Sequence, residues 1–107
     1  MGPEAKLLKE TQRYATAHGV PCIRLVFHRG IAAGWPDLLL LIPGGKPLWL
    51  ELKAPTGKLT ALQTIRYLTL SERGYNVAVA YNINDARTAI ARALDAARLP
   101  ASRVNIP

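Results

Sequence analysis

Three charged side chains of this sequence have the types and spacing of a hydrolytic metal site. Asp37 follows Pro36 at the mouth of an apolar run, and Glu51 and Lys53 lie one residue apart in the next apolar segment. Two carboxylates that converge at a strand end can hold a hard divalent cation, and a neighbouring lysine can orient or stabilise a metal-bound nucleophile. The peptide carbonyl of Leu52 offers a further oxygen. This set predicts a metal-dependent phosphodiesterase.

The same residues have a plainer interpretation. Asp37 is also typical of a turn at a strand start, and a Glu51–Lys53 pair on a solvent-facing strand would contribute little to stability. A surface acid is disfavoured in the middle of an apolar strand, however, where Glu51 lies. Together with the apolar run between the two acids, this favours the metal site.

The chain is strongly basic. Its 107 residues include 14 Lys and Arg against 7 Asp and Glu, a formal net charge of +7. On so small a body this charge favours a polyanionic partner such as a nucleic acid. The side chains that we expect to contact phosphates flank the predicted site: Arg24, His28, Arg29, Lys58 and Arg66.

Length and composition are typical of a single folded domain over residues 1–107, with a C-terminal tail at 99–107. Cys22 is the only cysteine, which excludes an intrachain disulfide and a cysteine-based zinc site. No apolar run approaches the roughly 20 residues that span a membrane, and the first residues lack the apolar core of a signal peptide. We expect a reduced, cytoplasmic compartment.

Hydrophobic periodicity and capping residues divide the chain into helices and strands. The expected helices are Pro3 to His18, one capped by Thr60 and ending near Arg73, and one capped by Asn84 and ending near Ala97. The expected strands are Cys22 to Phe27, Leu38 to Ile42, a strand begun by Pro47 that reaches Lys53, and Asn76 to Tyr81. This order predicts an α/β fold with a mixed central sheet of about four strands flanked by helices, in which the strand-helix-strand crossover joins a parallel pair.

The register of the central hairpin decides whether the two acids meet. Leu38 to Ile42 shows no polar alternation, which predicts a central strand buried on both faces. Asp37 lies opposite Glu51 or Lys53 only if paired residue numbers have an even sum. We predict the even register, with a five-residue loop or a bulge.

Two helix acids are candidates for a third carboxylate. Glu4 falls on the apolar face of the first helix, with Leu7 and Thr11, whereas Glu10 falls on the solvent-facing side with basic residues such as Lys9. The helical phase favours Glu4, although an acid in a first turn also complements the helix dipole.

Gln63 follows Thr60 at the spacing of a capping box. It also shares a helical face with Tyr67, on the helix that leaves the Lys53 strand. Gln63 therefore caps the helix, contacts the site, or does both. Trp35, beside Asp37, is expected to be a wall of the site or a packing residue.

The order of these motifs resembles the VRR-NUC family of the PD-(D/E)XK nuclease superfamily. The likeness rests on Gly34-Trp35-Pro36-Asp37, Glu51-Leu52-Lys53, the following 54–59 segment, and Gln63 with Tyr67, and it runs from about Glu4 to Ala80. It implies a restriction-endonuclease-like core and a DNA nuclease that depends on Mg²⁺ or Mn²⁺. It also implies that the site consists of Glu4, Asp37, Glu51, Lys53 and Gln63. Because Glu10 is a second acid on the same helix, the match of Glu4 is less secure than the others.

Small stand-alone members resemble phage or bacterial proteins that act as homodimers on branched DNA, including four-way (Holliday) junctions. The resemblance thus implies a structure-specific endonuclease. Two alternatives remain: an archaeal-type Holliday junction resolvase of the same superfamily, and a non-catalytic DNA-binding module. The expected dimer interface is the alanine-rich final helix with Leu99, Val104 and Ile106, unless these residues pack on the sheet instead.

Overall fold

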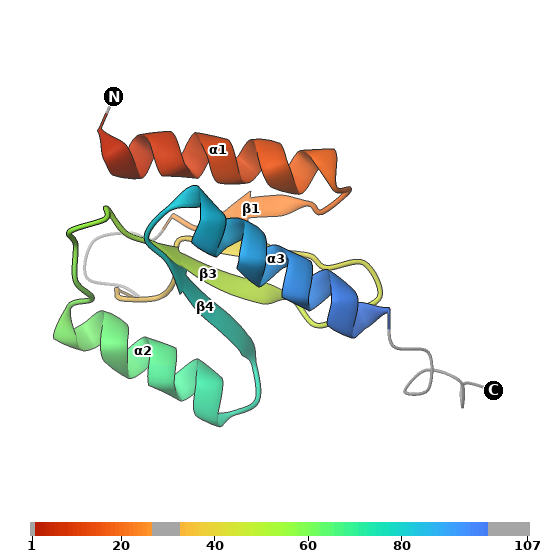
Figure 1. The fold of residues 1–107 in the computed structure, drawn as a ribbon. Helices are drawn as coiled ribbons and strands as arrows, with labels where there is room; N and C mark the ends of the chain where they lie inside the picture. Colours follow the sequence, from red (N-terminus) through yellow and green to blue (C-terminus); the bar gives the residue numbers. More distant parts are fainter. Residues whose placement is uncertain (1, 27–32, 99–107) are drawn as a thin grey trace.

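The computed structural model describes residues 2–26 and 33–98, which form a four-stranded sheet and three helices (Figure 1). The helices are α1 (Pro3–Ala17), α2 (Ala61–Glu72) and α3 (Ile83–Ala97). The strands are β1 (Cys22–Arg24), β2 (Leu38–Leu40), β3 (Leu48–Leu52) and β4 (Asn76–Ala80). The predicted α/β class and order of elements are confirmed. No helix within these described ranges is long and apolar enough to cross a membrane.

The sheet is mixed. Its strand order is β1-β2-β3-β4, with antiparallel pairing from β1 to β3 and a parallel β3–β4 pair. Because α2 connects the two parallel strands, the predicted crossover is confirmed.

The hairpin between β2 and β3 has the predicted even register. Leu38 pairs with Leu50 and Leu40 with Leu48, so the next step along the ladder brings position 37 opposite position 51. The connection is longer than predicted, since residues 41–47 lie between the last paired residues. The expected strand to Ile42 ends early because Ile42 already accepts a turn hydrogen bond from the Gly45 N–H, at 3.0 Å.

One face of the sheet carries the core. Leu38, Leu40, Leu48, Leu50 and Leu52 are at most 2 % exposed there, and buried side chains of α1 and α3 complete the same cluster. The helix α2 contacts β4 from the other side of the sheet (Figure 1).

The prediction that the Leu38–Ile42 segment is buried on both faces is therefore wrong. Leu39 is half-buried and Leu41 is 39 % exposed, because α2 covers only the β4 side of that face. The absence of polar alternation here reflects an apolar open face rather than a second helical layer.

Each of the last two helices has a short polar residue at its N-cap position. The side chain of Thr60 accepts a hydrogen bond from the Gln63 N–H, as predicted. The second cap is Asn82 rather than the expected Asn84: Asn82 accepts from the Asp85 N–H, and Asn84 lies in the first turn of α3. The two asparagines are two residues apart, and only Asn82 has the extended backbone that a cap requires. The first strand was predicted to reach Phe27, which lies outside the described residues, but β1 already ends at Arg24, and Leu25 and Val26 are not part of it.

Candidate active site

The candidate site lies at one end of the sheet, where β2 begins and β3 ends. The N-terminal ends of α1 and α2 approach the same end from the two faces of the sheet (Figure 1). Side chains from four separate elements can therefore meet there.

Asp37 is fixed by hydrogen bonds to its backbone and to its side chain. Its peptide oxygen accepts from the Leu25 N–H at 2.7 Å, and its carboxylate Oδ2 accepts from the Leu52 N–H at 2.9 Å. The N–H and C=O of one residue point to the same side of an extended strand. The Leu52 carbonyl thus lies on the Asp37 side of β3.

Glu51 is the one carboxylate of the site that is buried, at 4 % exposure. Burial, followed by the charge of Asp37 and a hydrogen bond with the Asp37 side chain, raises the pKa of Glu51 to about 8. Lys53 acts in the opposite direction, and the charge of Glu4 adds a small further increase. Glu51 is therefore protonated more readily than an ordinary carboxyl group, because its charge would lie buried beside that of Asp37.

Gln63 both caps α2 and contacts the site. Its Oε1 accepts from the Thr60 N–H at 2.9 Å, and its own N–H donates to Thr60 Oγ1 at 3.1 Å. Its Nε2 donates to Glu51 Oε2 at 3.3 Å. The side-chain amide thus connects the start of α2 directly to the buried acid.

The two lysines differ in burial and in their effect on Glu51. Lys53 is half-buried just beyond the end of β3, where its charge acts on Glu51. Lys58 is exposed in the connection between β3 and α2.

The structure brings Glu4 toward Asp37 and keeps Glu10 away. Glu4 and Asp37 line the same cavity, whereas Glu10 lines a different depression between α1 and α3. Glu4 is nevertheless exposed, and no three His, Cys, Asp or Glu side chains of residues 2–26 and 33–98 are grouped as a preformed metal site. The two acids that the structure brings into contact are Asp37 and Glu51.

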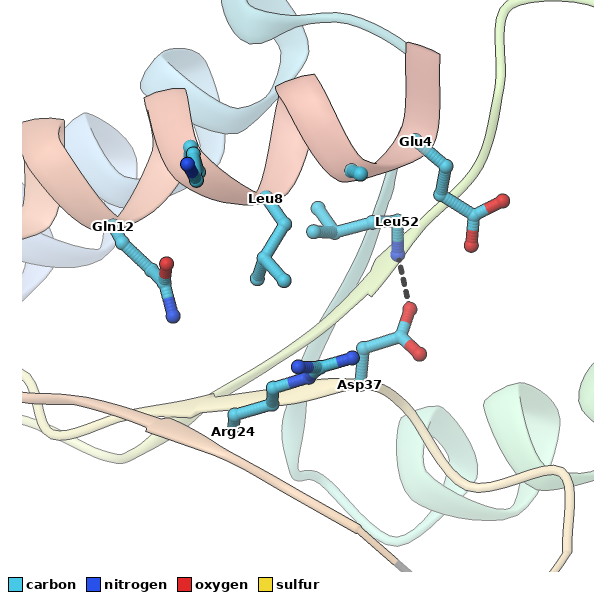
Figure 2. Close-up of a pocket in the computed structure, with 8 residues that line it drawn as sticks. Glu4, Leu8, Gln12, Arg24, Asp37 and Leu52 are labelled. Atoms are coloured by element: carbon cyan, nitrogen blue, oxygen red, sulfur yellow. Dashed lines mark hydrogen bonds between the residues drawn. The ribbon is translucent and has the colours of Figure 1, made fainter. Parts of the chain in front are cut away.

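A cavity of about 450 Å³ opens beside Asp37, between α1 and the β1–β2 edge. Figure 2 shows Leu8 and Gln12 pointing into it from α1, and Arg24 extending along the sheet side of the cavity toward Asp37. Its other lining residues are Glu4, Ala5, Lys9 and Leu52. Lys9 therefore lines the cavity, although helical phase assigns it to the solvent side, because the cavity reaches the flank of α1.

The loop before Asp37 is attached to α2. The Arg66 guanidinium lies over the Trp35 ring, 4.6 Å from the ring centroid, and Arg66 Nε donates to the Ala33 carbonyl at 3.3 Å. Gly34 has φ +84°, and a Cβ there would lie 2.6 Å from Leu62 Cγ. Only glycine permits this close approach between the Asp37 loop and α2. Because the Trp35 ring is covered by Arg66 of α2, Trp35 is a packing residue between that loop and the helix.

Sequence reasoning did not identify every residue of this region. Gln12 and the Trp35–Arg66 contact carry no local signal, because they arise from elements far apart in the chain. His28 and Arg29, two of the expected DNA-contacting residues, lie outside the described residues.

Comparison with known proteins gives one family. The family model of the VRR-NUC domain matches residues 3–82. A solved structure described as "VRR_NUC domain" has a TM-score of 0.75 and 24 % sequence identity, covering 85 % of this chain and 97 % of its own. A second, described as "VRR_NUC domain protein", has a TM-score of 0.73 and 19 % identity, covering 88 % and 89 %. No curated protein matches the chain in sequence.

Proposed function

We propose that this chain, which belongs to the VRR-NUC family, is a divalent-metal-dependent DNA endonuclease. The VRR-NUC domain is a nuclease domain, which makes DNA the substrate class. The observation that carries the proposal is the contact between Asp37 and the buried Glu51, whose pKa is raised to about 8. Two carboxyl groups in contact, one of them buried, form a site whose negative charge a divalent cation would compensate.

The donor set fits Mg²⁺ or Mn²⁺, because oxygen ligands are what these ions prefer. Asp37, Glu51 and the Leu52 carbonyl would hold the ion, and Glu4, which lines the same cavity as Asp37, would complete the set. When bound, the ion would lower the pKa of a water molecule and neutralise charge on the scissile phosphate.

The other residues act on the water and on the phosphate. Lys53 orients the attacking water and stabilises the negative charge that develops on the phosphate oxygens. Gln63 holds the Glu51 carboxylate by donating to Oε2, at 3.3 Å. One water adds across the phosphodiester: its oxygen bonds to phosphorus, one P–O bond breaks, and the two new ends carry a phosphate and a hydroxyl.

We further propose that the enzyme acts as a homodimer on branched DNA. Two cuts on opposing strands of a four-way junction need two sites, and a two-fold dimer supplies them with the matching symmetry. The net charge of +7 supports binding to the phosphate-rich surface of a junction. Exposed Arg24 and Lys58 flank the acids and are suited to contact its backbone.

Cleavage of matched linear, flap and four-way-junction DNA, with Mg²⁺ or Mn²⁺ titrated from zero, tests the proposal. We expect cutting only with metal and fastest cutting of the junction. Lys53→Ala should abolish cleavage while leaving the far-UV circular dichroism and DNA binding intact, because this half-buried side chain stabilises the transition state and is not part of the core cluster.

Equal cleavage by Lys53→Ala and the parent protein would refute the role of the lysine. DNA binding by the parent without cleavage at any metal concentration would instead support the non-catalytic binding module.

A further inference from the structure

We propose that the cavity between α1 and the β1–β2 edge binds the nucleotide next to the scissile phosphate, with its base out of the duplex stack. The inference rests on the proposed nuclease function and deepens it, because it assigns a substrate class: DNA with an unpaired nucleotide at the cut.

The cavity is longer than a metal site needs to be. Glu4 and Gln12 both line it and lie eight residues apart on α1, which is about 12 Å along a helix. The acids Glu4 and Asp37 occupy one end, and Gln12 occupies the other (Figure 2). A volume of about 450 Å³ is within the usual range for small-molecule sites. There is therefore room for a nucleotide beyond the scissile phosphate.

The lining chemistry is suited to a base and its phosphate. Leu8, Ala5 and Leu52 give an apolar wall for the flat face of a base. The Gln12 amide can donate and accept at a base edge, and no hydrogen bond from this amide to another part of the described chain occupies it. Lys9 and Arg24 add the positive charge that a flanking phosphate requires.

A base inside a duplex cannot make these contacts. Both of its faces are stacked and its pairing edge is occupied, so it must leave the stack first. That step costs a few kcal/mol and costs least for an unpaired base. A cavity of this kind thus favours DNA with an unpaired nucleotide beside the cut, which is a property of flaps and of branch points that are not fully paired.

The test compares three substrates that share one sequence around the cut. The first is fully paired, the second has one unpaired nucleotide beside the cut, and the third has an abasic residue at that unpaired position. We expect the parent protein to cut the second about tenfold faster than the first, and the third no faster than the first. Equal cutting of the second and third would mean that the cavity holds only sugar and phosphate, which overturns the inference.

Two variants of Gln12 test the cavity itself. Gln12→Trp fills the space and Gln12→Leu removes the amide at similar volume, so both should reduce the unpaired-to-paired rate ratio toward one. Thr16→Trp is the matched control, since Thr16 is exposed one turn further along α1 and does not line this cavity. An unchanged ratio in both Gln12 variants would refute the inference.

A binding measurement separates this inference from the proposed function. The fluorescence of 2-aminopurine at the unpaired position should change when Lys53→Ala protein binds, and Gln12→Trp in that background should remove the change while DNA is still bound. If the parent cuts none of the substrates, the nuclease proposal fails and the fluorescence still decides the cavity. The same fluorescence change with and without Gln12→Trp would show that the base does not enter it.

Discussion

The register between β2 and β3 places the carboxyl groups of Asp37 and Glu51 in contact at the edge of the core. Glu51 is enclosed by apolar strands on either side, so water stabilises its charge poorly. In the metal-free protein its pKa, raised from an ordinary 4.5 to about 8, keeps it protonated at neutral pH. Binding of the proposed metal ion would have to displace that proton.

Metal affinity should therefore depend on pH. Below pH 8 the apparent affinity for Mg²⁺ or Mn²⁺ should fall by about tenfold per pH unit, because one proton competes with the ion. Isothermal titration calorimetry at pH 6.5, 7.5 and 8.5, in buffers of different ionisation enthalpy, measures both the affinity and the proton released. An affinity that does not change over this range would contradict the raised pKa.

The stability of the metal-free protein should change in the opposite sense. A folded-state pKa above the unfolded value means that the folded protein binds more protons, so the free energy of unfolding should fall as pH rises from about 4.5 through about 8. Glu51→Gln removes the titrating group and should flatten this part of the profile in urea unfolding curves.

The two helix acids give a matched pair of variants. Glu4→Gln should weaken metal-dependent cleavage by about tenfold or more, because Glu4 is across the cavity from Asp37. Glu10→Gln has the same charge change on the same helix but lies toward α3, and cleavage should be nearly unchanged. If Glu10→Gln reduced cleavage more than Glu4→Gln, the third metal-binding carboxylate would be Glu10, and the assignment of Glu4 to the site would be wrong.

At the scale of elements, α2 positions both halves of the site. Its first turn connects to Glu51 through Gln63, and its middle connects to the Asp37 loop through Arg66 on Trp35. Arg66 was expected to contact phosphates, but its guanidinium already has a stacking partner and a carbonyl acceptor. Its main effect should therefore be to position Asp37.

Replacing Arg66 by lysine separates the two roles. Arg66→Lys keeps the charge but loses the planar stack, so a positioning role predicts a fall in kcat on the order of tenfold with little change in the salt dependence of binding. Lys58→Ala is the comparison, because an exposed phosphate contact should weaken binding and reduce the salt slope by about one. If Arg66→Lys keeps the full kcat, the positioning role is wrong and Arg66 is better described as a phosphate contact.

Elements whose signals are local were predictable from sequence. The capping-box spacing of Thr60 and Gln63 predicts the start of α2, and the alternation of side chains along β3 predicts the face on which Glu51 lies. The cap of α3 was misplaced because Asn82 and Asn84 are both good caps and only the backbone distinguishes them. The open face at Leu39 and Leu41 could not be anticipated, since an apolar strand looks the same whether a helix or solvent lies above it. The Gln12 cavity and the Trp35–Arg66 stack depend on how separate elements meet.

At the scale of the whole molecule, the apolar face of α3 is not free for a partner. Ala86, Ile90, Ala93 and Leu94 are buried against the sheet and α1, which is the alternative to the interface expected for this helix. The tail residues Leu99, Val104 and Ile106 lie outside the described residues. Exposed apolar side chains instead occur on α2, where Ile65 is 54 % and Leu68 is 47 % exposed. These two residues are one helical turn apart and are suited to a two-fold contact.

A charge on this surface should separate the protomers of the proposed dimer. Ile65→Glu with Leu68→Glu should convert the dimer to a folded monomer, because each copy would place two acids against two others in an isologous interface. Light scattering measures the mass, and the ratio of four-way-junction to linear cleavage should fall toward one in the same variant. Leu41→Glu, on the open sheet face and 39 % exposed, is the control for an added surface acid. If Leu41→Glu alone yields the monomer, the sheet face is the interface; a parent protein that is already monomeric and cuts linear and branched DNA equally would refute the dimer itself.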